Sequence, residues 1–197
     1  EEPVQAKRIQ RKEIDEEGDP LSPSALEKVS DSPKVSWARS LFSPGECEFL
    51  RQIATPYLNA SMIVDPASGQ MRPDPIRTSE AAIFPWIDET PFIHALNRRI
   101  AAASTTAVEQ GEPLQVLRYS PGQEYRSHSD ALACVDNQPI ITVLVYLNDD
   151  FEGGETTFPR VGFSHRGRKG DALLFANVHA ATRAPDPLTL HAGLPPP

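Results

Sequence analysis

The sequence is poor in cysteine and in aromatic residues, and it has no long apolar run. Only two cysteines, Cys47 and Cys134, occur among its 197 residues, which argues against a disulfide framework and favours a reducing compartment. The longest apolar run, residues 140–147, is strand-sized and far below the roughly 18 residues that a membrane-spanning helix needs. No signal-peptide pattern opens the chain. We therefore expect a cytoplasmic protein that does not bind membranes, with a trimmed N-terminus because it does not start with methionine.

Basic residues are in the minority. Lysine and arginine number 19 against 27 acidic residues, a formal net charge of −8. Because binding to phosphates needs a basic face, this balance argues against nucleic acid as a partner. The one local basic run, residues 165–169, lies between two strand-like segments and is typical of a solvated loop. Hydrophobic residues make up 39% of the chain, which is enough for one domain with a packed core.

The chain divides into an extension and a compact part. Residues 1–34 alternate charges with Gly and Pro and have few apolar positions, so we expect an N-terminal extension or linker with a weak helix over 24–29. Residues 35–197 are expected to form the domain, with supporting helices over 43–103. Ser43, Pro44 and Glu46 predict a capped helix that ends before Pro56. Helical spacing of apolar residues predicts a second helix over 90–103, and residues 65–76 are expected to be a turn-rich loop.

Strand-like segments dominate after residue 111. They cover residues 114–119, 140–147, 155–158 and 171–175, and they are separated by turn residues such as the pair Gly153 and Gly154. Short strands at this spacing are typical of a β-sandwich or barrel and not of βαβ units. The sequence therefore predicts a mainly β fold with flanking helices, of the α+β class.

His128 and Asp130 are the first indication of chemistry. Residues i and i+2 of a strand point to the same face, so this imidazole and this carboxylate are expected to lie side by side. His191, 63 residues downstream, is the candidate for a third ligand. Two histidines and one carboxylate occupy one face of a metal ion and leave other positions open, a set that suits Fe(II) and its reaction with dioxygen.

The surroundings of these residues resemble the prolyl 4-hydroxylase-like branch of the 2-oxoglutarate- and iron-dependent dioxygenases. Six blocks agree with that family in order and spacing, and they cover about residues 114–195. The blocks are LRYSPGQEY (117–125), HSD (128–130), TVLVYLN (142–148), EGGETTFP (152–159), KGDALLF (169–175) and LHAG (190–193).

The resemblance implies a fold, a metal site and a reaction. The fold would be a double-stranded β-helix, a jelly-roll or cupin-like barrel, with its metal-binding core over residues 112–197. His128, Asp130 and His191 would hold Fe(II), with 2-oxoglutarate as cosubstrate and ascorbate as a candidate reductant. The enzyme would hydroxylate a prolyl residue or a related amino-acid or peptide unit, releasing succinate and carbon dioxide.

Further positions match the family outside the ligand set. Tyr119, Thr142 and Tyr146 match residues that line the cosubstrate pocket, and Tyr125 matches a tyrosine on the substrate side. The alternative for Tyr146 is an aromatic residue of the core. The remaining histidines, His94, His165 and His179, match no ligand block.

Two departures from the family concern the cosubstrate and the substrate. Relatives carry a Lys or Arg about ten residues after the second ligand histidine, in a last strand, whereas this chain ends at Pro197. We expect that this strand is missing because the chain is cut short; the alternative is a replacement by Arg168, Lys169 or Arg183. Several peptidyl-prolyl members also have an Arg where this chain has Pro139, so the substrate stays open.

Three functions compete. A 2-oxoglutarate-dependent hydroxylase acting on a peptide, a protein or an amino acid leads. A non-catalytic metal-binding module of the same fold is the alternative, which the missing basic residue favours. A zinc hydrolase comes third, because no residue near the histidines supplies a clear general base. The sequence indicates neither the oligomeric state nor the role of residues 1–34.

Overall fold

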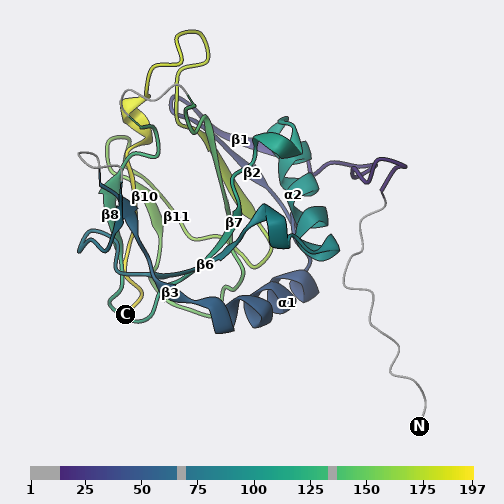
Figure 1. Cartoon of the computed structure of the whole chain (residues 1–197). Coiled ribbons are helices and arrows are strands. Elements are labelled where there is room, and N and C mark those ends of the chain that lie inside the picture. The colour runs from purple at the N-terminus through teal and green to yellow at the C-terminus, as the bar shows by residue number, and fades with distance from the viewer. Residues whose placement is uncertain (1–13, 66–69, 133–136) are drawn as a thin grey trace.

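Short strands make up most of the regular structure. The computed structural model describes residues 14–65, 70–132 and 137–197, and Figure 1 shows α1 and α2 gathered at one side of the strands. The helices are α1 (Pro44–Ala54) and α2 (Pro91–Ser104), with the short 3-10 helices η1 (Thr55–Tyr57), η2 (Trp86–Asp88), η3 (Val108–Gln110) and η4 (Pro187–Thr189). The strands are β1 (Leu26–Asp31), β2 (Lys34–Ala38), β3 (Asn59–Ala60), β4 (Ile63–Val64), β5 (Met71–Arg72), β6 (Glu80–Phe84), β7 (Leu114–Arg118), β8 (Tyr125–His128), β9 (Ile141–Val145), β10 (Thr156–Phe158), β11 (Phe163–His165), β12 (Ala172–Ala176) and β13 (His191–Gly193).

The strands pair in antiparallel sheets. One four-stranded sheet has the order β1-β2-β12-β9, and a second has the order β11-β10-β13-β8. A three-stranded sheet, β3-β6-β7, and the hairpin β4-β5 complete the pairing among the described residues. The prediction of a mainly β fold with flanking helices is therefore confirmed.

β12 lies at the centre of the packing because both of its faces are buried. Side chains alternate between the faces of a strand. Ala172 and Leu174 pack in the hydrophobic cluster that includes α1 and α2, whereas Leu173 and Phe175 pack in a second cluster with Phe158 of the other four-stranded sheet. The sheet that contains β12 is therefore covered by helices on one side and by the second sheet on the other.

The two long helices begin where the sequence predicts. Ser43 accepts a hydrogen bond from the Glu46 backbone and Glu46 accepts one from the Ser43 backbone, which completes the capping box of α1. Thr90 is the corresponding N-cap of α2, and its hydroxyl accepts a hydrogen bond from the Ile93 backbone N–H. These local signals suffice because each cap satisfies donors within its own first turn.

Two predictions about the N-terminal half are wrong. Residues 24–29 do not form a helix: β1 begins at Leu26 and pairs with β2, so part of the expected extension is an edge strand of a four-stranded sheet. Residues 65–76 are not simply a loop, because Met71 and Arg72 form β5 and pair with β4. In both places the backbone hydrogen-bonding groups are paired with a neighbouring strand, and local composition does not reveal this pairing.

Other expectations concern the cysteines and membrane crossing. Cys47 is a buried free thiol in α1, and Cys134 lies outside the described residues. Within the part of the chain that the structure describes, neither α1 nor α2 has the length and apolar character needed to cross a membrane. The loop predicted at residues 65–76 includes residues 66–69, which lie outside the described ranges.

A buried ion pair joins the two helices. Arg99 of α2 is 4% exposed and Glu46 of α1 is 0% exposed. The guanidinium donates through Nη1 to Glu46 Oε2 at 2.9 Å and through Nη2 to Glu46 Oε1 at 2.5 Å, and Nη1 also donates to the Leu41 carbonyl. Glu46 thus both caps α1 and neutralises the only charge that α2 buries among the described residues.

We expect the Arg99→Met variant to lose about 3–5 kcal/mol of unfolding free energy, because Glu46 would keep a buried charge without its partner. Urea denaturation monitored by circular dichroism measures this change. Arg51→Met is the matched control, since Arg51 pairs with Glu48 on the exposed side of α1 and should lose no more than about 1 kcal/mol. Equal losses in the two variants would contradict the role given to the buried pair.

We also expect His165 to make stability depend on pH. Its ring packs edge-on against Trp37 with centroids 3.5 Å apart, and burial, assisted by Arg39, lowers the pKa of His165 to about 4. Between an ordinary pKa near 6.5 and about 4, the unfolded chain binds more protons than the folded one, so stability falls as pH is lowered through this window. Chemical denaturation at pH 7.5, 6, 5 and 4 should show a shallower decline for His165→Phe than for the unsubstituted protein. Identical slopes would remove His165 as the cause.

Candidate metal centre

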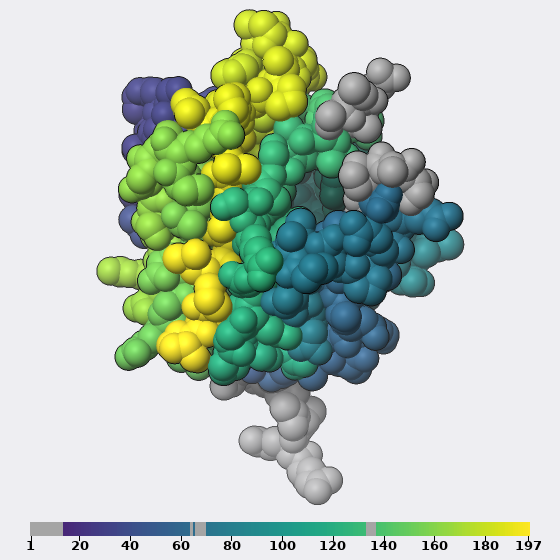
Figure 2. All heavy atoms as spheres, turned by 90° about the vertical axis from the view of Figure 1, so that its left-hand side faces the viewer, coloured from purple at the N-terminus to yellow at the C-terminus, as the bar shows by residue number. Residues whose placement is uncertain are grey.

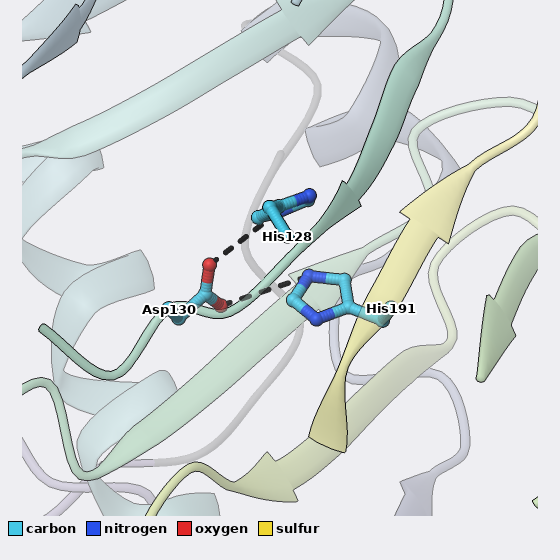
Figure 3. Close-up of side chains that lie close together, drawn as sticks. All are labelled: His128, Asp130 and His191. Atoms are coloured by element: carbon cyan, nitrogen blue, oxygen red, sulfur yellow. Dashed lines mark ion pairs between the residues drawn. The ribbon is translucent and has the colours of Figure 1, made fainter. Parts of the chain in front are cut away.

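Three side chains converge between β8 and β13. His128 ends β8, His191 begins β13, and the register of the two strands places these residues directly opposite each other. Asp130 follows two residues after β8, and its carboxylate points toward both imidazoles (Figure 3). One ligand atom from each residue lies within 4.8 Å of the others, and in the described part of the chain no other group of three His, Cys, Asp or Glu side chains is gathered in this way.

Asp130 reaches the cluster by a different route from the predicted one. Because β8 ends at His128, Asp130 lies in a bend beyond the strand and the alternation of strand side chains does not position it. Its Oδ1 lies 3.5 Å from His128 Nε2, and its Oδ2 lies 3.8 Å from His191 Nε2. The predicted neighbours are therefore brought together, but by a turn of the backbone.

Backbone carbonyls set the tautomer of both imidazoles. His128 Nδ1 lies 2.8 Å from the Arg126 carbonyl oxygen, and His191 Nδ1 lies 3.0 Å from the Thr189 carbonyl oxygen. A carbonyl can only accept, so each ring carries its proton on Nδ1 and presents the lone pair of Nε2 to the cluster. This is the outer-shell arrangement that orients histidine ligands of metals.

The electrostatics of the cluster favour a neutral His191 imidazole beside an ionised Asp130 carboxylate. Burial lowers the pKa of His191, although Asp130 opposes this effect. Burial alone would raise the pKa of Asp130, but the His128 and His191 rings and the Thr142 hydroxyl outweigh it, so this pKa is lowered. Metal ions bind these deprotonated forms. Two imidazole nitrogens and one carboxylate oxygen therefore fit Fe(II), with further coordination positions left for small molecules.

Tyr125 and Arg77 border the cluster on the side of β8. The Tyr125 ring stacks on the His128 ring with centroids 3.4 Å apart, and the guanidinium of Arg77 lies 4.9 Å from the Tyr125 ring centroid. Arg77 Nη1 donates to the Met62 carbonyl, while its Nε is buried without a hydrogen-bond partner among the described residues. Sequence reasoning missed Arg77, because nothing in the residues around it predicts that its side chain packs against β8.

Tyr119 and Thr142 also lie close to the cluster. The Tyr119 hydroxyl lies 3.6 Å from where a Cβ on Gly193 would stand, which places it beside β13, and burial raises the pKa of Tyr119. Thr142 Oγ1 donates to Asp130 Oδ2 at 2.5 Å. The hydroxyl that the sequence assigns to the cosubstrate is thus engaged by the metal-site carboxylate, and its contact with a cosubstrate stays a prediction.

Tyr146 is engaged in the core between the sheets. Its hydroxyl donates to Thr156 Oγ1 at 3.1 Å, and its ring packs in the hydrophobic cluster of Phe158 and Leu173. Burial raises the pKa of Tyr146 to about 12. This environment agrees with the alternative of an aromatic residue of the core, and its part in cosubstrate binding stays a prediction.

The other histidines and the candidate cations lie elsewhere. His94 contacts Glu89, and His179 lies 4.0 Å from Asp186 on the exposed side of a turn. Arg168 and Lys169 line a separate surface pocket of about 490 Å³ with Arg39, Asp149 and Asp171.

The surface is hollowed near the segments that carry Arg77 and Tyr125. Figure 2 shows this hollow between the blue chain around residues 60–80 and the green chain around residues 115–132. Hydrogen bonds between the two segments join its walls: the Thr78 backbone donates to the Glu124 carbonyl, and the Glu124 backbone donates to the Thr78 hydroxyl. The side chains of His128 and Asp130 are 12% and 26% exposed, so solvent reaches these two members of the cluster, whereas the His191 side chain is only 6% exposed.

Comparisons with known proteins agree with this geometry. A family profile described as the 2OG-Fe(II) oxygenase superfamily matches residues 114–196. Prolyl 4-hydroxylase 1 of Arabidopsis thaliana is 38% identical over 186 residues, which are 85% of this chain and 65% of that protein. Probable prolyl 4-hydroxylase 4 of the same plant is 31% identical over 201 residues, which are 89% of this chain and 67% of that protein. The chain thus spans about two thirds of the length of these curated relatives.

Solved structures show the same likeness. A viral collagen prolyl hydroxylase from Paramecium Bursaria Chlorella virus-1, in complex with 2OG, superposes with a TM-score of 0.60 at 28% identity, covering 85% of this chain and 90% of that one. A prolyl-4-hydroxylase from Pseudomonas putida superposes with a TM-score of 0.55, covering 82% of this chain and 85% of that one; at 19% identity it supports the fold alone.

We expect the protein to bind one Mn(II) ion, a redox-stable substitute for Fe(II), and the His191→Ala variant to bind it more than about 100-fold more weakly, since removal of a ligand should exceed the effect of outer-shell changes. Isothermal titration calorimetry measures both affinities. The His94→Ala variant, which removes a histidine outside the cluster, should bind Mn(II) like the unsubstituted protein. Unchanged affinity in His191→Ala would exclude the cluster as the metal site.

Proposed function

The chain belongs to the prolyl 4-hydroxylase family of the 2OG-Fe(II) oxygenase superfamily, and we propose that it is a 2-oxoglutarate-dependent dioxygenase that hydroxylates a prolyl residue of a peptide or protein. The observation that carries this proposal is the cluster of His128, Asp130 and His191, with both Nε2 atoms turned toward one carboxylate. Relatives named as prolyl 4-hydroxylases support the substrate class.

We propose a double-stranded β-helix as the frame of the domain at residues 35–197. Two four-stranded antiparallel sheets support it, because Leu173 and Phe175 of one sheet pack against Phe158 of the other. The extension proposed at residues 1–34 contributes β1 as an added edge strand through its pairing with β2. The metal cluster lies at the edge of the second sheet formed by β8, where a substrate can approach without crossing the core.

The proposed cofactors are Fe(II), held by His128, Asp130 and His191, and 2-oxoglutarate. Iron and 2-oxoglutarate, when bound, supply the oxidation: dioxygen places one oxygen atom in succinate, formed with carbon dioxide, and the other in the substrate C–H bond. The protein contributes a fixed set of ligands and a partly closed environment. Phe158 and Phe175 pack against the His191 ring, which excludes water from the inner side of the cluster.

Tyr125 is proposed to contact the substrate. Its ring is held between His128 on one face and the guanidinium of Arg77, so it forms a rigid wall beside the metal ligands. The edge of this aromatic ring beside the metal suits a pyrrolidine ring, whose apolar methylene groups can pack against it. We propose that the peptide reaches this wall through the hollow between the segments that carry Arg77 and Tyr125.

Tyr119 is the proposed cosubstrate residue with the strongest geometric support. Its hydroxyl lies beside Gly193, two residues after His191, and interacts with the buried Ser79 hydroxyl. A phenol in this position can donate a hydrogen bond to a carboxylate of 2-oxoglutarate. For Thr142 and Tyr146, the proposed role in cosubstrate binding rests on the family resemblance. In this structure the Thr142 hydroxyl donates to Asp130 and the Tyr146 hydroxyl donates to Thr156.

The test is turnover by the full-length protein with Fe(II), 2-oxoglutarate, ascorbate and a proline-rich peptide. We expect succinate to form and the peptide to gain the mass of one oxygen atom, with both products lost in the Asp130→Ala variant because it lacks the carboxylate ligand. Mass spectrometry of the peptide and a coupled succinate assay measure the two products. His94→Ala is the control and should keep both.

Other outcomes would redirect the proposal. Metal binding without 2-oxoglutarate binding in calorimetry would favour a non-catalytic module of the same fold. Succinate without a change in peptide mass would retain the reaction and reject the prolyl substrate.

A further inference from the structure

Asn177 lies behind the metal cluster and is completely buried. It follows β12 directly, and its side chain has 0% exposure. Its Nδ2 donates to Thr142 Oγ1 at 2.8 Å, and Thr142 Oγ1 in turn donates to Asp130 Oδ2 at 2.5 Å. Asn177 Oδ1 is buried without a hydrogen-bond partner among the residues that the structure describes. The amide, the hydroxyl and the carboxylate therefore form a short relay that ends on Asp130.

The direction of this relay is fixed by proton counting. An ionised carboxylate can only accept, so at 2.5 Å the proton between Thr142 and Asp130 belongs to the threonine hydroxyl. With its single proton used, Thr142 Oγ1 must accept from its other neighbour, and an amide NH₂ can only donate. Asn177 therefore has to face Thr142 with its nitrogen, which explains why its carbonyl oxygen is the atom left without a partner.

The cluster is sensitive to how this carboxylate is turned. In Figure 3, Asp130 lies between the rings of His128 and His191 and is carried by a bend, not by a strand. The two imidazoles are each fixed by a backbone carbonyl. Among the residues that the structure describes, the Thr142 hydroxyl is the only donor to the Asp130 carboxylate from outside the cluster. Its rotation about the Cβ–Cγ bond therefore depends on Thr142.

We infer that Asn177 is a positioning residue for the metal site, which acts through Thr142 to hold Asp130 Oδ2 and leave Oδ1 directed at the metal. This inference rests on the proposed function, since it assumes that the cluster holds Fe(II). Asn177 itself contacts none of the three ligands through its side chain. Its Nδ2 occupies the acceptor side of Thr142 Oγ1 and so supports the orientation in which the Thr142 proton points at Asp130.

A purely structural role does not account for the side chain of Asn177. The backbone already ties this segment in place, because Asn177 N donates to the Ile140 carbonyl and the Asn177 carbonyl accepts from Asp186 N. An apolar side chain at this buried position would avoid leaving an amide oxygen without a partner. The retained amide is explained by the direction that it gives to the hydrogen bond on Asp130.

The test compares Asn177→Leu and Asn177→Asp with Thr142→Val and Thr142→Ser. The probes are Mn(II), for the dissociation constant by calorimetry, and Co(II), for the d–d absorption bands that report ligand geometry. We expect both Asn177 variants and Thr142→Val to bind Mn(II) roughly 10–100-fold more weakly and to change the Co(II) bands, because the outer shell is lost. Thr142→Ser keeps the hydroxyl and should bind like the unsubstituted protein.

A double-substitution cycle separates the relay from a general structural effect. If Asn177 acts through Thr142, then Asn177→Leu should add little to the loss in the Thr142→Val background. Additive losses would overturn the relay. Asn59→Asp repeats the amide-to-acid change on an exposed side chain that donates to the Tyr57 carbonyl, and it should leave metal binding unchanged.

Each remaining outcome has one meaning. Unchanged Mn(II) affinity and Co(II) bands in folded Asn177 variants would reject the inference and leave the proposed function intact. If the Asn177 variants do not fold, undiminished affinity in Thr142→Val still rejects the relay, and weakened affinity in Thr142→Val with recovery in Thr142→Ser supports it. Absence of metal binding in the unsubstituted protein would instead reject the proposed function.

Discussion

The antiparallel pairing of β8 with β13 is the constraint on which the site depends. It places His128 directly across from His191, so two residues 63 positions apart in the chain present their rings to the same space. A shift of this pairing by one residue would turn one imidazole to the opposite face of the sheet. The aromatic rings of Phe158 and Phe175 pack against His191 and favour the observed register. The metal site is therefore a property of the sheet and not of a short motif.

The ligands are oriented by groups that belong to four separate segments. Arg126 and Thr189 contribute backbone carbonyls, Thr142 contributes a hydroxyl from β9, and Asn177 contributes an amide at the end of β12. Backbone carbonyls are insensitive to substitution at their own residues, whereas the hydroxyl and the amide are not. The orientation of the two histidines thus depends on the backbone, whereas the orientation of the aspartate depends on the side chains of Thr142 and Asn177.

The sequence predicts best what is decided locally. The caps at Ser43 and Thr90 and the helical spacing behind them predict both long helices, because their signals lie within one turn. The meeting of His128, Asp130 and His191 is also predicted, since the sequence blocks around them match the family in order and spacing. The strand β1 is missed because pairing with β2, and not its composition, makes it a strand. Arg77 and Asn177 are missed because each acts on residues 35 or more positions away, and no local pattern marks such contacts.

The two-sided burial of β12 has a consequence for how this chain can diverge. A strand with one solvated face can exchange half of its side chains freely, but the four residues from Ala172 to Phe175 all face packed layers. The helices limit the size of the side chain at position 174, and the sheet that carries the two histidines limits its size at position 173. Substitutions that change side-chain size in the helices and substitutions near the metal site are therefore expected to be coupled, since each change in volume has to be accommodated through the same strand.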